Sequence, residues 1–124
     1  MTRVYTEEHE WVDVDGDVAT IGVSKFAAEQ LGDDIVAAED ILEVGETVSK
    51  DDILFVFEKA KAAVEVYAPV SGEIVEVNPF LTEDAEAFHE KLMGLNWLMK
   101  IRMSDTSDLD GYMSEDDYKA FSEG

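Results

Sequence analysis

Short apolar stretches alternate with turn residues along most of the chain, and this pattern predicts a protein built mainly of β-strands. Near the N-terminus, two stretches of strand-forming residues, 11–14 and 18–23, flank the pair Asp15-Gly16. An Asp-Gly pair readily adopts the positive φ angles of a tight turn. We therefore predict a β-hairpin at this position.

A short helix is predicted directly after this hairpin. Ser24 can cap its first turn, and the helix runs over residues 25–31. Gly32 follows at the position where helices commonly end in a left-handed residue. Two apolar residues of this segment, Phe26 and Leu31, are expected to face the protein interior.

The centre of the chain predicts further short strands. Apolar or alternating stretches occur at 53–57, 64–67 and 73–77, and this spacing is typical of a β-sandwich or barrel. Residues 44–48 also resemble residues 70–74 in sequence. This internal similarity suggests two related half-sheets that face each other.

The last third of the chain is mixed. Residues 98–103 alternate and predict a closing strand, and Ser114 begins a capping box that opens a short helix. Tyr118 and Phe121 lie three residues apart on this helix, so we expect them to pin it to the sheet.

No linker divides the chain. We therefore expect a single domain over residues 1–124, of the α+β class but mostly β, with a C-terminal helical extension at about 104–122.

The charge of the chain excludes several partners. It has 30 acidic and only 9 basic residues, with a formal net charge of −21. Nucleic acids and anionic membrane surfaces would be repelled, since basic groups supply most of the affinity for phosphates. The longest uninterrupted apolar run, 53–57, is far too short to span a bilayer, and no signal peptide is recognisable. A cytoplasmic location is the simplest expectation.

Catalytic and metal chemistry find little support. The chain has no cysteine, so no disulfide, thiol nucleophile or thiolate metal site can form. Its two histidines, His9 and His89, are far apart in sequence, and the acidic stretch from Thr106 to Asp117 lacks the end residues of a calcium loop. We therefore expect neither a metal site nor catalytic residues.

One hairpin tip departs from ordinary turn chemistry. Residues 58–63, Glu-Lys-Ala-Lys-Ala-Ala, join two predicted strands without any Gly, Asn, Asp or Pro. Local departures of this kind often mark functional sites. Small alanines flank Lys61, which leaves its amine open to approach. The alternative is an ordinary solvated lysine, because most exposed lysines have no specific role.

The sequence around this tip resembles the lipoyl-attachment region of the glycine cleavage system H protein family. The similar segment runs from Glu58 through Lys61 to Asn78. Further similar segments occur in family order: His9-Glu10-Trp11-Val12, Ala19-Thr20-Ile21-Gly22-Val23, residues 29–33 and Trp97-Leu98-Met99-Lys100-Ile101. Together they cover nearly the whole chain, and the His-Glu-Trp start distinguishes it from a generic lipoyl or biotinyl domain.

The resemblance implies that lipoate is attached through an amide to Lys61. The spacing to Glu58, Glu65 and Pro69 favours Lys61 over Lys59. The matching motif residues are Glu58, Ala62, Pro69 and Gly72. The implied fold is a lipoyl/biotinyl-type hybrid sandwich, or flattened barrel, in which residues 53–68 form the lipoyl hairpin.

The implied function is that of a non-catalytic carrier. In the family, the lipoyl arm takes an aminomethyl group from glycine at the pyridoxal-phosphate P protein and delivers it at the T protein, and the L protein reoxidises the arm. A lipoate-attaching enzyme is a further partner. The loaded arm is held in a cleft on the carrier, and the positions that match it here are Glu10, Glu65, Val23 and Leu31. Plain surface charge is the alternative explanation for Glu10 and Glu65.

Three segments depart from the family pattern. Lys59-Ala60 replaces the usual Ser or Thr and aliphatic residue before the lysine. Residues 32–42 lack the usual Val-Glu-Leu-Pro sequence of the family, and this segment is longer than in the family. Residues 89–94 replace an Asn-x-x-Pro-Tyr-Gly loop. An H-like protein that relays lipoate to other acceptors therefore stays open, as does an unmodified acidic interaction domain. A mitochondrial location would require that a transit peptide had been removed. For a carrier, the acidity would attract basic surfaces of its partner enzymes.

Overall fold

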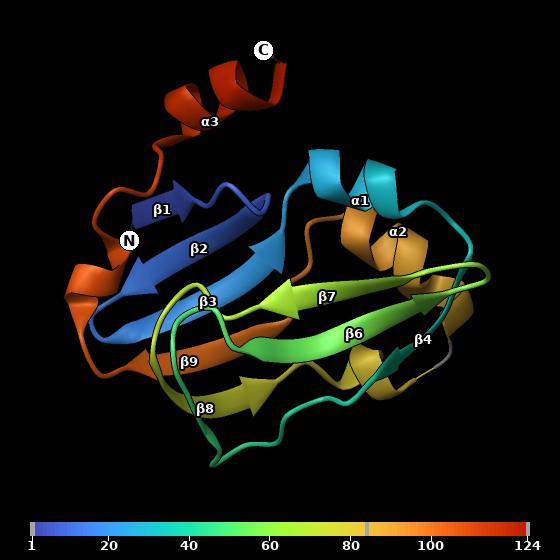
Figure 1. The fold of residues 1–124 in the computed structure, drawn as a ribbon, viewed down its shortest axis with the longest axis horizontal. Coiled ribbons are helices and arrows are strands. Elements are labelled where there is room, and N and C mark those ends of the chain that lie inside the picture. The colour runs from blue at the N-terminus through green and yellow to red at the C-terminus, as the bar shows by residue number, and fades with distance from the viewer. Residues whose placement is uncertain (1, 84, 124) are drawn as a thin grey trace.

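The protein folds into two antiparallel β-sheets with helices at one end and a further helix at the C-terminus (Figure 1). The computed structural model describes residues 2–83 and 85–123. The six-stranded sheet has the order β1 (Thr2–Tyr5), β2 (Glu10–Asp15), β3 (Val18–Val23), β9 (Met99–Met103), β8 (Gly72–Val77) and β5 (Thr47–Val48). The three-stranded sheet has the order β4 (Ile35–Glu39), β6 (Ile53–Lys59) and β7 (Ala63–Tyr67). The expected α+β, mostly β class is confirmed.

The helices are short. The α-helices are α1 (Lys25–Leu31), α2 (Phe88–Met93) and α3 (Glu115–Glu123), and the 3-10 helices are η1 (Pro79–Thr82), η2 (Ala85–Ala87) and η3 (Thr106–Leu109). No helix within the described ranges has the length and apolarity needed to cross a membrane.

The predicted N-terminal hairpin is present, with its turn displaced by one residue. Asp15 pairs with Val18, so Gly16 and Asp17 form the loop. Only Gly16 needs a positive φ, of +62°. A glycine at the first loop position suits the twist of a two-residue hairpin, and the turn therefore centres on Gly16-Asp17 rather than Asp15-Gly16.

Helix α1 begins and ends where the sequence predicts. The hydroxyl of Ser24 accepts a hydrogen bond from the Ala27 N–H at 3.1 Å, and Gly32 ends the helix with φ +75°. Leu31 is buried as expected. The prediction for Phe26 was wrong, because this ring is 37% exposed and lies at the rim of a cavity.

The core lies between the two sheets. Val12, Ile21, Ile74 and Ile101 of the larger sheet belong to the same buried cluster as the side chains of β6. Two phenylalanine rings of β6, Phe55 and Phe57, meet edge to face with centroids 4.9 Å apart, and Phe57 contacts Phe88 of α2 in the same manner. Burial of each large apolar side chain contributes about 1.5–3 kcal/mol, so this cluster fixes β6, and with it the hairpin that β6 begins.

The internal sequence similarity does not relate the two sheets. Its two copies instead pair with each other in the larger sheet, where Thr47 lies opposite Glu73 and Val48 lies opposite Gly72. The prediction of two facing half-sheets was therefore wrong.

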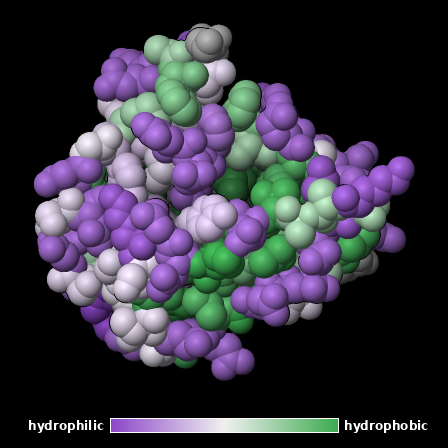
Figure 2. Space-filling model, in the orientation of Figure 1, coloured by the Kyte–Doolittle hydropathy of each residue, from purple (hydrophilic) through white to green (hydrophobic). Residues whose placement is uncertain are grey.

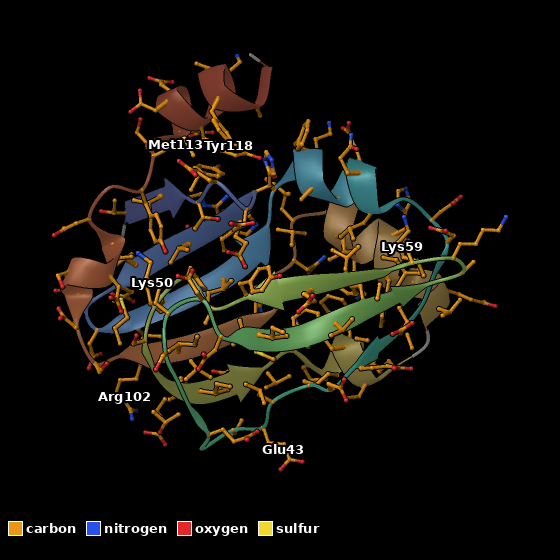
Figure 3. The ribbon with its side chains drawn as sticks, viewed as in Figure 1. Glu43, Lys50, Lys59, Arg102, Met113 and Tyr118 are labelled. Atoms are coloured by element: carbon orange, nitrogen blue, oxygen red, sulfur yellow. The ribbon has the colours of Figure 1, made fainter. Side chains whose placement is uncertain are left out.

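Helix α3 packs against the N-terminal strands through one face. Ser114 caps it by accepting a hydrogen bond from the Asp117 N–H. Tyr118 is buried and stacks on Tyr5 of β1 with ring centroids 4.5 Å apart; in Figure 3 its label lies between α3 and the strands. Phe121 is 45% exposed and contacts the ring of His9. Of the two aromatic residues, Tyr118 therefore packs on a strand, whereas Phe121 contacts the turn before β2.

Candidate functional site

Lys61 lies at the tip of the β6–β7 hairpin, which projects at one end of the molecule (Figure 1). The Lys59 N–H donates to the Ala62 carbonyl at 2.8 Å, so Ala60 and Lys61 form the tip. Neither tip residue has a positive φ. A turn with negative φ angles needs no Gly or Asn, and this explains the unusual composition of residues 58–63.

The two lysines of the hairpin differ in their surroundings. The ammonium of Lys59, labelled in Figure 3, lies 3.4 Å from a carboxylate oxygen of Asp34, and its side chain is only 20% exposed. The Ala60 N–H donates to the Asp34 carbonyl at 3.3 Å, which ties the tip to the segment after α1. Lys61 is exposed, and its ammonium has no ion pair or hydrogen bond with any described residue. Of the two amines, only that of Lys61 is free to react.

A cavity of about 250 Å³ opens between β7, the start of β2 and helix α1. The four cleft residues expected from the sequence, Glu10, Glu65, Val23 and Leu31, all line it. Its other lining residues are Glu8, His9, Phe26, Ala27, Gln30, Val64, Val66 and Tyr67. Apolar surface dominates the lining, and Figure 2 shows apolar residues gathered around α1 and along β6 and β7. We name this space the arm cleft.

Glu10 is the chemically unusual member of the arm cleft. It is 3% exposed, and one carboxyl oxygen accepts a hydrogen bond from the Thr6 hydroxyl at 3.3 Å. The other oxygen, Oε2, is buried without a partner among the residues that the structure describes. Burial raises the pKa of Glu10 from 4.5 to about 8; the Thr6 hydrogen bond opposes this rise, and the nearby carboxylates of Glu8 and Asp51 add to it.

Glu65 differs from Glu10 although both line the arm cleft. It lies on β7, where it pairs in register with Val56, and its side chain is exposed. Glu8 is exposed as well. The cleft therefore has one buried carboxyl with a raised pKa, that of Glu10, and two exposed carboxylates, those of Glu8 and Glu65.

A contact network that the sequence did not predict supports one edge of the cleft. The Tyr118 hydroxyl lies 2.8 Å from Nδ1 of His9 and 2.7 Å from the hydroxyl of Ser24. The Tyr118 hydroxyl therefore bridges the imidazole of His9 and the Ser24 hydroxyl, whose oxygen also accepts the Ala27 N–H. Helix α3 thereby holds His9, a cleft residue with φ +65°, in place.

The remaining motif residues have structural positions near the hairpin. Glu58 lies opposite Ala63 in the β6–β7 register, and Ala62 closes the tip. Pro69 is buried, and its carbonyl accepts a hydrogen bond from the Tyr112 hydroxyl. Gly72 has φ +156°, and a Cβ at this position would collide with the carbonyl of Arg102.

The structure brings no metal-binding group together in its described ranges. Nowhere in residues 2–83 and 85–123 do three His, Cys, Asp or Glu side chains gather closely enough to hold a metal ion.

Comparison with known proteins decides the family. The family model described as glycine cleavage H-protein matches residues 3–124. The chain belongs to this family. A glycine cleavage system H protein from Parvibaculum lavamentivorans is 45% identical over 119 residues, covering 96% of this chain and 94% of that protein. The one from Thermotoga maritima is 43% identical over 119 residues, with the same coverage.

A solved structure supports the same assignment for the fold. The crystal structure of an H protein from Mycobacterium marinum superposes with a TM-score of 0.81 at 30% identity, and the match covers 98% of this chain and 97% of that one. The two-sheet architecture is therefore the lipoyl-type β-sandwich of H proteins, as the resemblance implied. As a member of this family, the chain is a carrier subunit of the glycine cleavage system.

Proposed function

We propose that Lys61 carries lipoate in amide linkage and that the chain shuttles the aminomethyl group of glycine from the P protein to the T protein. The observation that carries this proposal is a free amine on an exposed hairpin whose second strand, β7, forms one wall of the arm cleft. Lys61 precedes Val64, the first cleft residue of β7, by three residues, about 10 Å along an extended strand. An arm attached there begins close to the cleft.

The residues of the arm cleft fit such an arm and its cargo. Attached lipoate would supply a disulfide whose one sulfur takes up the aminomethyl group while the other becomes a thiol; once that group has been passed on, both sulfurs would be thiols for the L protein to reoxidise. The apolar walls, which include Val23 and Leu31, suit the hydrocarbon of the arm. The unpartnered oxygen of Glu10 suits the ammonium of the cargo, because a buried carboxylate needs a positive partner.

Glu10 also favours uptake of a cation over a neutral group. Without a positive charge nearby, its raised pKa keeps the buried carboxyl protonated and uncharged near neutral pH. A cargo ammonium that enters the cleft favours the ionised form, since opposite charges attract strongly where water is scarce. The ammonium then has a charge-assisted hydrogen bond in a partly dry site, which shields it from solvent.

Lys59 serves a different purpose in this proposal. Its ion pair with Asp34, together with the Ala60 contact to the same residue, holds the hairpin tip in one position. Lys61 is thereby presented to the lipoate-attaching enzyme while Lys59 is not. We propose no catalytic role for any residue of the chain, and we place the protein in the cytoplasm with its P, T and L protein partners.

Reconstitution with P protein tests the function. The lipoylated chain should support glycine-dependent exchange of carbon dioxide, the Lys61→Arg variant should not, and Lys59→Arg should behave like the unaltered chain. Absence of exchange despite complete lipoylation would instead support lipoate relay to other acceptors. A chain that cannot be lipoylated at all would point to an unmodified interaction domain.

A further inference from the structure

His9 is the residue through which helix α3 reaches the arm cleft. Its ring contacts Phe26 of α1 and Phe121 of α3, with centroid distances of 4.5 and 5.6 Å. Its Nδ1 lies 2.8 Å from the hydroxyl of Tyr118, and His9 lines the cleft together with Glu10. One wall of the cleft is therefore held by a side chain 109 positions away in the sequence.

The backbone at His9 needs these contacts. Its φ is +65°, a left-handed value that a residue with a side chain adopts at a cost in free energy. The His9 N–H donates to the Thr6 carbonyl at 3.1 Å, and Thr6 also contacts the backbone N–H and the carboxyl group of Glu10. His9 and Glu10 thus belong to one turn, and a contact that fixes His9 helps to fix Glu10.

Tyr118 is the buried residue by which α3 joins this turn (Figure 3). Its hydroxyl also lies 2.7 Å from the hydroxyl of Ser24, the residue that caps α1. The Ser24 N–H in turn donates to the His9 carbonyl at 2.9 Å. These three residues form a closed set of contacts at the edge of the arm cleft, and neither Tyr118 nor Ser24 lines the cleft itself.

We propose that Tyr118 is a positioning residue for the loaded arm. Its hydroxyl holds His9 in the cleft wall, and it thereby couples the seating of α3 to retention of the aminomethyl cargo. This role rests on the proposed function, in which the loaded arm lies in the arm cleft. Coupling between two sites is reciprocal, so an occupied cleft must stabilise the seated form of α3 by the same factor.

Cargo lifetime on the lipoylated, full-length carrier measures the coupling. Tyr118→Phe keeps the ring stacked on Tyr5 and removes only the hydroxyl. Hydrolysis of the cargo to formaldehyde and ammonia should become about three- to tenfold faster, the factor that one hydrogen bond contributes.

Ile74→Val is the control for a general loss of stability. It removes one buried methylene group from the core, outside the cleft lining and outside the Tyr118 contacts. It should destabilise the fold and leave the cargo lifetime unchanged. An unchanged lifetime in Tyr118→Phe, or an equal shortening in Ile74→Val, would overturn the proposal.

A double-mutant cycle tests whether Tyr118 acts through His9. His9→Asn removes the imidazole but keeps a residue type that adopts a positive φ readily. In this background Tyr118→Phe should shorten the lifetime by less than about twofold, because the contact that it breaks is already absent. An equal effect of Tyr118→Phe in both backgrounds would overturn the proposal.

An assay without the arm separates this role from the function proposed for Lys61. Hexylammonium has an apolar chain and an ammonium group, and it is titrated into the unmodified, ¹⁵N-labelled chain while the N–H signals of cleft residues Val23 and Val66 are followed. So small a ligand is expected to bind with a Kd on the order of millimolar. Tyr118→Phe should raise this Kd by about three- to tenfold, and Ile74→Val should leave it unchanged.

Hydrogen exchange at Tyr118 gives the reciprocal measurement. Its backbone N–H donates to the Ser114 carbonyl at 2.9 Å in the first turn of α3. Saturating hexylammonium should slow exchange of this N–H by the same factor of about three to ten. Unchanged exchange, an unchanged Kd in Tyr118→Phe, or no saturable binding to the unaltered chain would overturn the coupling. Failure of P protein to load the lipoylated chain would instead overturn the proposed function, and the hexylammonium results would still decide the role of Tyr118.

Discussion

The hydroxyl of Thr6 donates a 3.3 Å hydrogen bond to the buried carboxyl group of Glu10, and it is the one side chain among the described residues that does so. Thr6 also accepts hydrogen bonds from the Glu8 and Glu10 backbone N–H groups, so its position is fixed by the turn that precedes β2. The turn thus holds the Glu10 carboxyl in the wall of the arm cleft, with Oε2 buried and without a partner among the described residues.

Glu10 should make the stability of the protein depend on pH. Its pKa is raised from 4.5 to about 8 in the fold, so the folded state binds this proton more tightly than the unfolded state. The stability it contributes is fully present below about pH 4.5 and is lost as the pH rises through 8.

Urea denaturation of the unaltered chain and of Glu10→Gln, at several pH values from 5 to 8, measures this effect. At each pH, the free energy of unfolding of Glu10→Gln is subtracted from that of the unaltered chain. The difference excludes the pH dependence of all other titrating groups, because the variant lacks only the titration of Glu10. The free energy of unfolding of the unaltered chain, relative to the variant, should fall by up to about 1.4 kcal/mol per pH unit. A difference that stays constant across this range would show that Glu10 is already ionised at pH 5.

Glu10→Gln should shorten the lifetime of the aminomethyl cargo. Glutamine has nearly the same shape but cannot supply a negative charge to the cargo ammonium. A charge-assisted hydrogen bond contributes about 1.5–3 kcal/mol, so loss of the cargo from the lipoylated carrier should be about tenfold faster or more. Release of ammonia or formaldehyde with time measures it.

Glu8→Gln is the matched control for this change. Glu8 lines the same cleft but is exposed, so its charge is screened by solvent and its replacement should alter the lifetime by less than about threefold. Equal lifetimes in Glu10→Gln and the unaltered carrier would contradict the role given to Glu10.

Gly72→Ala should destabilise the fold strongly. A Cβ at Gly72 would meet the carbonyl of Arg102 on the neighbouring strand, and φ is +156°. We expect the free energy of unfolding to fall by about 2–4 kcal/mol, as measured by urea denaturation.

Gly16→Ala separates the collision from backbone strain. Gly16 has φ +62° with no atom within 4 Å of an added Cβ, so only the left-handed conformation is penalised, by about 1 kcal/mol. Similar losses in the two variants would show that the close approach of β8 and β9 is not what requires glycine at position 72.

Tyr118→Phe should loosen helix α3 without removing its aromatic contact. The ring can still stack on Tyr5, but His9 and Ser24 lose their hydrogen bonds to the hydroxyl. The expected loss is about 1–2 kcal/mol in the free energy of unfolding. Phe121→Leu, at an exposed ring on the same helix, should cost less than about 1 kcal/mol. A larger loss in the free energy of unfolding for Phe121→Leu than for Tyr118→Phe would assign the anchoring of α3 to Phe121.

Much of the fold follows from local sequence rules. Ser24 and Gly32 delimit α1 at the predicted residues because both caps act within one helical turn. Strand β4 and helix α2 were missed for the opposite reason. Residues 35–39 form a strand only because β6 pairs with them, and residues 88–93 form a helix that is anchored by Phe88 in the core. Tertiary contacts decide such segments, and no local pattern shows them.

The site was predictable in part. Lys61 and the four cleft residues come from the family resemblance, and the structure brings the four together in one cavity. The Tyr118 contact with His9 joins residues 109 positions apart, and the partner of Lys59, Asp34, lies outside any recognised motif. Side-chain contacts between distant segments leave no periodic signal in a single sequence, so neither could be foreseen.

The attachment site itself is tested most directly by peptide mapping after treatment with a lipoate-attaching enzyme. The unaltered chain and Lys59→Arg should each gain one lipoyl mass, located on the peptide that contains Lys61, and Lys61→Arg should gain none. A Lys61→Arg chain that still acquires the lipoyl mass would contradict the account.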